Sequence, residues 1–198
     1  MKKRIAAIMF FILCVFLGSQ LLFAREAVAK KALFIIAAKD FQDDEFAQPK
    51  AVLENSGVEV TVASTTLDEI TGMNGAKAQA DILLSDAVVA DYDAIVFIGG
   101  SGAQQYLDDP LAQKIAQDSV AQGKITAAIC LAPVILANAG VLEGRNATCY
   151  PTNGEVLSGA GVNYTTQPVE VDGKIITADG PSSAEQFGQE ISKALAAQ

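Results

Sequence analysis

The sequence contains no histidine, and this absence excludes several classes of catalytic site. A Ser-His-Asp or Cys-His triad needs an imidazole as its base, and a histidine-based zinc site needs one as a ligand. Those mechanisms are therefore ruled out within the chain. Any proton transfer near neutral pH must use another group, such as a thiol, a carboxyl or a phenol. We expect no metal ion and no cofactor.

Positive charge is scarce as well. The chain has 14 Lys and Arg residues against 23 Asp and Glu residues, which gives a formal net charge of -9. Binding to DNA or RNA depends on cations that neutralise the phosphate backbone, so nucleic acid is not an expected partner. Hydrophobic residues make up 51 % of the 198 residues, which is enough for one domain with a sizeable core.

The sequence also lacks an uninterrupted apolar run long enough to span a bilayer. The run near the N-terminus covers residues 5–18 and follows the cationic residues 2–4. A membrane-spanning helix needs roughly 20 apolar residues, whereas a shorter run after positive charges is typical of a signal peptide. Residues 1–29 are therefore predicted to direct export, most simply into a bacterial periplasm.

Cleavage of such a signal peptide is expected after Ala24, or after Ala29 in the small-residue context Ala27-Val28-Ala29. The expected mature protein is one soluble domain, residues 30–198, with no stable membrane association. The alternative is a protein tethered to the membrane by an uncleaved N-terminus, because residues 21–23 extend the apolar stretch. Export would also make Cys130 and Cys149 candidates for a disulfide, a pairing that the sequence leaves open.

In the rest of the chain, short apolar runs alternate with amphipathic stretches, which predicts a doubly wound α/β sandwich. A hairpin is indicated where Asp172-Gly173 separates two short apolar runs. The expected strands are residues 32–38, 59–64, 94–98 and 125–129, and the expected helices are residues 46–53, 110–122, 133–139 and 182–197.

Ligands of open α/β sheets bind outside the carboxyl ends of the strands, which directs attention to Cys130. This cysteine ends a buried strand, and a helix starts almost at once at Pro133. Such a turn exposes its side chain at the sheet edge, and a helix N-terminus favours a thiolate. Cys130 is therefore placed like a nucleophile; the alternative is a buried and inert cysteine.

Two further segments follow predicted strands. The glycines of residues 99–102 let backbone N–H groups approach a ligand or an oxyanion, although the spacing matches neither nucleotide-binding fingerprint. Asp43 and Asp44 read as favourable charges in the first turn of a helix. Glu45 precedes the core-facing Phe46, so its carboxyl can point along the sheet edge and meet the cysteine.

Taken in order, these motifs resemble the ThiJ/PfpI superfamily, which includes the parkinsonism-associated deglycase and the so-called intracellular proteases. The resemblance covers residues 31–195 and rests on four segments. These are FQDDE at residues 41–45, GGSGAQQY at residues 99–106, AAIC followed by Pro133, and VEVDGKIITADGP at residues 169–181. It implies a flavodoxin-like three-layer sandwich with a mostly parallel central sheet and a nucleophile elbow, usually assembled as a homodimer.

The resemblance also implies roles for individual residues. Cys130 matches the reactive cysteine, and Glu45 matches the carboxyl that hydrogen-bonds the sulfur and moves a proton. The backbone N–H groups of Gly100 and Leu131 match the oxyanion hole. Members of the superfamily convert methylglyoxal to lactate without a cofactor, reverse early glycation, or sense oxidants by forming a cysteine sulfinate.

Two departures from the family pattern narrow the expected activity. Leu131 stands where the protease-like branch has a histidine, so peptidase activity has no support. Tyr150 stands where the glyoxalase and deglycase branch has a histidine, and a phenol donates a hydrogen bond but is a poor base at neutral pH. If residues 147–151 form a strand, Cys149 faces away from Tyr150 and from Cys130.

Three functions therefore compete. The leading hypothesis is a weak cofactor-independent glyoxalase- or deglycase-type action on small reactive carbonyls, with Cys130 as nucleophile. The runner-up is a non-enzymatic stress protein in which an oxidant converts Cys130 to a sulfinate held by a protonated Glu45. The third is a binding domain that uses the same pocket without covalent chemistry.

Overall fold

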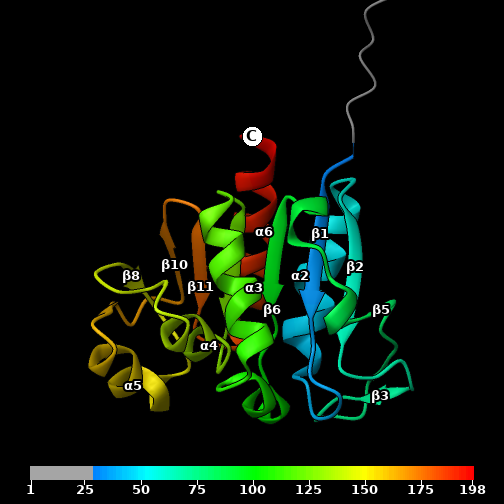
Figure 1. Ribbon diagram of the computed structural model, residues 1–198, viewed down its shortest axis with the longest axis horizontal. Helices are drawn as coiled ribbons and strands as arrows, with labels where there is room; N and C mark the ends of the chain where they lie inside the picture. Colours follow the sequence, from blue (N-terminus) through cyan, green and yellow to red (C-terminus); the bar gives the residue numbers. More distant parts are fainter. Residues whose placement is uncertain (1–28) are drawn as a thin grey trace, which may run out of the picture.

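A seven-stranded sheet forms the centre of the computed structural model, which describes residues 29–198 (Figure 1). The predicted signal peptide lies outside the described residues, apart from Ala29. The strands of this sheet are β1 (Lys31–Ile35), β2 (Glu59–Ser64), β5 (Ile82–Leu83), β6 (Ala94–Phe97), β7 (Ile125–Ile129), β10 (Val169–Asp172) and β11 (Ile175–Ala178). Their order across the sheet is β10-β11-β7-β6-β1-β2-β5.

Within this sheet every pair of neighbouring strands is parallel except β10 and β11, which form the predicted hairpin. The fold is therefore the flavodoxin-like sandwich that the sequence predicted. Its parallel strands carry their carboxyl ends to one edge, the lower edge in Figure 1. That edge is where a doubly wound sheet binds its ligands.

Helices cover both faces of the sheet. One face carries α2 (Asp43–Asn55) and α6 (Ala184–Ala196), and the other carries α3 (Pro110–Ala121) and α4 (Pro133–Asn138), while α5 (Gly154–Gly159) lies beyond the β10 side. Short 3₁₀ helices connect these elements, namely η1 (Leu84–Asp86), η2 (Val89–Asp91), η3 (Ser101–Tyr106), η4 (Pro151–Asn153) and η5 (Pro181–Ser183). Among residues 29–198, no helix is both long and apolar enough to cross a bilayer.

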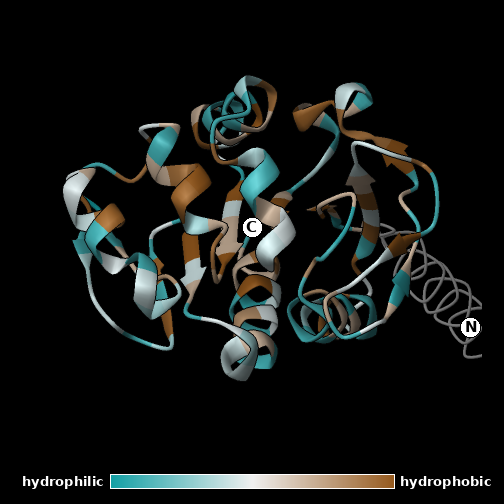
Figure 2. Cartoon of the chain, turned by 90° about the horizontal axis from the view of Figure 1, so that it is seen from below, coloured by the Kyte–Doolittle hydropathy of each residue, from teal (hydrophilic) through white to brown (hydrophobic). Residues whose placement is uncertain are grey.

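Two hydrophobic clusters, one on each face of the sheet, form the core. Neighbouring residues of β1 point to opposite faces, so Leu33 joins the cluster under α3 and α4 while Phe34 joins the cluster under α2 and α6. The α6 side chains Phe187 and Ile191 complete the second cluster and are fully buried. Seen from the carboxyl ends of the strands in Figure 2, hydrophobic colour runs along the strands, and hydrophilic colour gathers on outer loops and helices.

Local signals explain where α2 and α3 begin. The Gln42 side chain accepts a hydrogen bond from the Glu45 N–H at 2.8 Å, which caps α2 at its first turn. Asp109 caps α3 in the same way by accepting from the Ala112 N–H at 2.7 Å, and Pro110 takes the first helical position.

The structure corrects the predicted pattern at several points. The first strand ends at Ile35 rather than Ala38, because residues 36–42 form the loop that carries Phe41 into the core. Residues 148–150 belong to no strand, although a strand was considered at residues 147–151. The sequence did not predict α5, β5 or the small two-stranded sheets β3 (Ile70–Thr71) with β4 (Lys77–Ala78) and β8 (Asn146–Ala147) with β9 (Asn163–Tyr164). Two-residue strands are too short to have a detectable period.

Candidate active site

Cys130 lies on a sharp turn at the carboxyl end of β7. Its backbone N–H donates to the carbonyl of Ala178 at 2.9 Å, and its φ is 65°, a left-handed conformation that is uncommon outside glycine. The chain then turns through Leu131 and enters α4 at Pro133. This is the strand-to-helix elbow expected from the sequence, and it leaves the cysteine side chain partly exposed at the sheet edge.

Glu45 comes from the first turn of α2 and has no exposed surface. Neither of its carboxyl oxygens has a hydrogen-bond partner of good geometry among the described residues. The Cys130 thiol and the Gly99 N–H nevertheless lie close enough to the carboxyl to lower its pKa. Burial outweighs both neighbours and raises the pKa of Glu45 to about 7. The carboxyl can therefore accept or donate a proton at neutral pH.

The surroundings of Cys130 favour the protonated thiol over the thiolate. Burial raises its pKa to about 12, and the charge and hydrogen bond of Glu45 add to the increase. The N–H groups of Gly100 and Leu131 lower the pKa but do not compensate. The pKa is therefore raised, not lowered as the sequence predicted, because burial and Glu45 outweigh the local N–H groups.

Two glycines let the turn after β6 approach the thiol. A Cβ atom on Gly99 would lie 2.7 Å from the Cβ atom of Cys130, closer than real contacts allow. Gly100 has a φ of 99°, and a Cβ atom there would lie 2.5 Å from the carbonyl oxygen of Asp40. Only glycine fits both positions, and the Gly100 N–H is consequently presented toward the sulfur.

A cavity of about 450 Å³ brings the predicted site residues together. Tyr150 reaches it from the extended segment before η4, where its N–H donates to the carbonyl of Cys130 at 2.8 Å and its ring lies against Gly180. The lining residues are Gln42, Glu45, Met73, Asn74, Gly100, Ser101, Gln104, Cys130, Leu131, Tyr150, Thr152, Asn153 and Pro181. All five residues assigned to the site from the sequence are in this set.

Cys149 lies next to Tyr150 in the chain but not in this cavity. Its side chain is fully buried in the hydrophobic cluster under α3 and α4, whereas Tyr150 is 44 % exposed and lines the cavity. Burial raises the pKa of Cys149 to about 12. Both Cys130 and Cys149 are free thiols, so the disulfide considered from the sequence is not formed.

Sequence reasoning missed Met73, which lines the cavity, and the role of Asp43, which fixes the turn that carries Met73. Asp43 was interpreted only as a favourable charge in a helix, yet its carboxylate accepts hydrogen bonds from the N–H groups of Asn74 and Ala76, at 2.9 and 2.7 Å. Met73 lies in the β3–β4 turn that these bonds fix. No signal in the sequence links Asp43 to a turn about 30 residues later.

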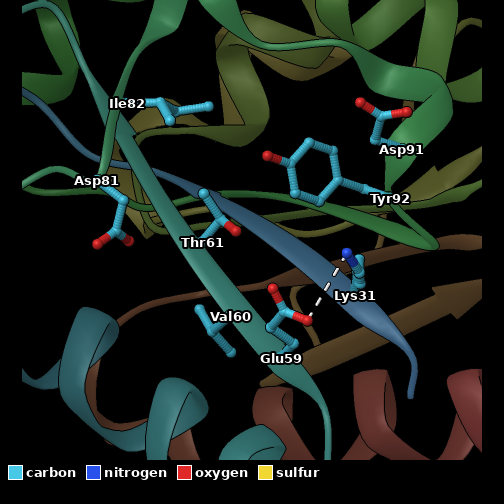
Figure 3. Close-up of a pocket in the computed structure, with 8 residues that line it drawn as sticks. All are labelled: Lys31, Glu59, Val60, Thr61, Asp81, Ile82, Asp91 and Tyr92. Atoms are coloured by element: carbon cyan, nitrogen blue, oxygen red, sulfur yellow. Dashed lines mark ion pairs between the residues drawn. The ribbon is translucent and has the colours of Figure 1, made fainter. Parts of the chain in front are cut away.

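A second hollow, of about 630 Å³, lies at the amino ends of β1 and β2 (Figure 3). Lys31 and Glu59 form an ion pair across it at 3.7 Å, and Asp81 accepts a hydrogen bond from the Val62 N–H at 2.7 Å. No cysteine lines this hollow, and it lies at the sheet edge opposite Cys130. The chemistry expected from the sequence therefore belongs to the smaller cavity.

Comparison with known proteins identifies the family of the chain. A family model described as the DJ-1/PfpI family matches residues 30–194. The chain belongs to the DJ-1/PfpI family. An uncharacterized protein of Methanocaldococcus jannaschii is 42 % identical to it over 168 residues, which cover 83 % of this chain and 82 % of that protein.

Other relatives carry a functional name or a solved structure. A protein of Pyrococcus horikoshii named as a deglycase is 33 % identical over 165 residues, covering 83 % of this chain and 99 % of that protein. The crystal structure of a ThiJ/PfpI domain protein from Brachyspira murdochii superposes with a TM-score of 0.84 at 31 % identity, covering 86 % of this chain and 98 % of that one. This DJ-1/PfpI chain is thus similar to its relatives over nearly its whole described length.

Proposed function

We propose that this DJ-1/PfpI protein is a weak, cofactor-independent enzyme that acts on small reactive carbonyl compounds through Cys130. One observation carries the proposal: the thiol lies beside a fully buried carboxyl, Glu45, whose pKa is raised to about 7 by burial, and two backbone N–H groups face the same sulfur. Relatives named as deglycases support this choice of chemistry.

The first step forms a bond between Cys130 and an aldehyde carbon. The ionised fraction of Glu45 accepts the thiol proton as the sulfur attacks, so no free thiolate has to be present beforehand. The electron pair of the C=O bond moves to oxygen, where the N–H groups of Gly100 and Leu131 stabilise it. Return of the proton from Glu45 to this oxygen gives a hemithioacetal.

The second step converts the hemithioacetal of a 2-oxoaldehyde into a thioester. Glu45 removes the proton from the former aldehyde carbon, and the electron pair of this C–H bond forms the C=C bond of an enediol as the neighbouring ketone oxygen is protonated. The hydroxyl on the first carbon then loses its proton and becomes the thioester carbonyl, while Glu45 returns a proton to the second carbon. The first carbon is thus oxidised and the second reduced within one molecule. Water then cleaves the thioester, which releases the thiol and a 2-hydroxy acid. Methylglyoxal and water give lactate in this way, with no external oxidant or reductant.

Tyr150 has a supporting role in this scheme. Its side chain lines the cavity and stands where related enzymes have a histidine. A phenol can donate a hydrogen bond to the ketone oxygen but cannot relay protons near neutral pH. All proton transfers therefore depend on Glu45, which is why we expect slow turnover.

The alternative function is oxidant sensing without turnover. Peroxide would oxidise Cys130 to a sulfenate and then a sulfinate, which a protonated Glu45 holds by a hydrogen bond. The exposure of Cys130 and the full burial of Cys149 favour this reading as well. The proposal also includes export by the N-terminal segment and assembly as a homodimer, on the grounds of the sequence pattern and the family resemblance.

The test is to incubate the mature protein with methylglyoxal and to measure lactate. Wild type is expected to form lactate above the rate in buffer, and Cys130→Ala is expected to form none. Cys149→Ala is the matched control, because it removes a thiol that does not line the cavity. Equal lactate formation by wild type and Cys130→Ala would refute the proposal.

A further inference from the structure

Met73 is an exposed apolar side chain held at the wall of the Cys130 cavity. It lies in the turn between β3 and β4, and 51 % of it is exposed. Its backbone N–H donates to the carbonyl of Phe41 at 2.9 Å, and its sulfur accepts from the Ser101 N–H at 3.3 Å. The backbone and the side chain of Met73 are thus both hydrogen-bonded to segments that line or support the cavity.

Asp43 fixes the turn that carries Met73. Its two carboxylate oxygens accept the N–H groups of Asn74 and Ala76, on either side of the turn. Gly72 packs so closely that a Cβ atom there would lie 2.7 Å from an Asp43 oxygen. Because Asp43 and Glu45 share the first turn of α2, the position of Met73 relative to the proton-transfer group is set by one rigid element.

The charge of the cavity restricts what can bind beside Met73. None of the described residues that line it is Lys or Arg, and its ionisable side chains are Glu45, Cys130 and Tyr150. Asp179 and Asp44 add negative potential at Glu45. A carboxylate or phosphate on the substrate would meet this negative potential with no cation to balance it.

We propose that Met73, positioned by Asp43, is a specificity-determining residue that contacts the non-reacting end of the carbonyl compound and selects uncharged, apolar ends. The substrate class is therefore neutral 2-oxoaldehydes with an alkyl or aryl substituent, and anionic 2-oxo acids and phosphorylated aldehydes are excluded. The identity of the substrate rests on the proposed function. The selectivity of the cavity can be tested without that function, because reagents that alkylate Cys130 must pass Met73 at the cavity wall to reach the thiol.

A methionine suits this role physically. Its side chain is unbranched and polarizable, so it adapts to apolar groups of different shape. Each methylene group that it covers favours binding by about fourfold. Removal of the side chain should therefore reduce the preference for a larger apolar end by about fivefold to tenfold.

The first experiment measures alkylation of Cys130 by mass spectrometry, with rates normalised to 2-mercaptoethanol. The probes are iodoacetamide against iodoacetate for charge, and N-phenylmaleimide against N-methylmaleimide for apolar size. Wild type should prefer the neutral and the larger apolar probe. Met73→Ala should lose the size preference, and Met73→Lys should raise the iodoacetate rate relative to iodoacetamide.

Matched variants test whether the position of Met73, and not only the presence of its side chain, sets the size preference. Asp43→Asn should shift the size preference in the same direction as Met73→Ala, whereas Asp44→Asn, at the neighbouring exposed position, should not shift it. Leu67→Ala controls for loss of an exposed apolar side chain, since Leu67 is 47 % exposed and does not line the cavity.

The second experiment compares kcat/KM for phenylglyoxal, methylglyoxal and 4-carboxyphenylglyoxal, a 2-oxoaldehyde that carries a negative charge at its non-reacting end. Turnover of phenylglyoxal and methylglyoxal but not 4-carboxyphenylglyoxal, with the phenylglyoxal preference lost in Met73→Ala, supports the inference. If no carbonyl is turned over but the alkylation preferences hold, the proposed function fails and the cavity selectivity stands. If alkylation and turnover are indifferent to charge and to Met73→Ala, the inference is wrong while the carbonyl chemistry stands.

Discussion

The Glu45 carboxyl and the Cys130 thiol lie within hydrogen-bonding reach of each other, although one belongs to the start of α2 and the other to the end of β7. The parallel sheet makes this meeting possible, because β1 and β7 both carry their carboxyl ends to the same edge. Glu45 raises the pKa of the Cys130 thiol, whereas the thiol lowers the pKa of Glu45; burial raises both pKa values, so the pair keeps at least one proton at neutral pH.

The burial of Glu45 predicts how stability depends on pH. Its pKa is raised by burial from 4.5 to about 7, so the folded state keeps a proton that the unfolded state releases between these values. The free energy of unfolding therefore falls as pH rises from about 4.5 to about 7, by about 3 kcal/mol at most. The stabilisation is complete below this window and is lost above it.

Urea unfolding at several pH values measures this effect. Glu45→Gln cannot ionise, so its free energy of unfolding should change less across the same window. A wild-type curve that rises between pH 4.5 and 7, or a Glu45→Gln curve parallel to it, would contradict the assigned pKa.

Tyr150→Phe should have a smaller effect on turnover than changes at Glu45. The substitution keeps the ring beside Gly180 and the Tyr150 N–H bond to Cys130, and it removes only the phenol hydroxyl. Loss of one hydrogen bond that orients the substrate should lower kcat/KM for methylglyoxal by about tenfold or less. A complete loss of lactate formation in Tyr150→Phe would mean that the phenol itself transfers a proton.

Mild peroxide should add oxygen mainly to Cys130. Cys149 is fully buried, whereas Cys130 opens into the cavity. Mass spectrometry of a non-reduced digest should show sulfenate or sulfinate on the Cys130 peptide and an unmodified Cys149 peptide. A Cys130–Cys149 disulfide as the main product would contradict this prediction.

The elbow and the sheet were predictable because their signals are local. Continuous apolar runs predicted three of the strands and alternation predicted β2, while the cysteine that ends a strand shortly before Pro133 predicted the turn. Glu45 was predicted from its place after the first strand, supported by the family resemblance. These features depend on neighbours in the sequence, so the sequence alone reveals them.

The contacts of Met73 and Asp43 were not predictable, because they join parts of the chain that only the fold brings together. The two-residue strands β3 and β4 have no period of their own, so nothing indicated a turn beside the cavity. The pKa of the Cys130 thiol was predicted in the wrong direction for the same reason. Burial by tertiary packing sets it, and local helix position does not.

The N-terminal segment provides a test of export. The mature protein should begin at Arg25 or Lys30, since the apolar run is short for a membrane span. N-terminal sequencing of protein from the periplasmic fraction decides the position. Recovery only from membranes, with Met1 intact, would favour the tethered alternative.

The central claim is that Glu45 moves the protons for chemistry at Cys130, and Glu45→Gln tests it most directly. The amide keeps the shape of the side chain and can still donate a hydrogen bond, but it cannot transfer a proton. Lactate formed from methylglyoxal should fall by about 100-fold or more, while peroxide still oxidises Cys130. Full lactate formation by Glu45→Gln would contradict the claim. If wild type forms no lactate but Glu45→Gln changes the yield of Cys130 sulfinate, oxidant sensing replaces turnover as the function.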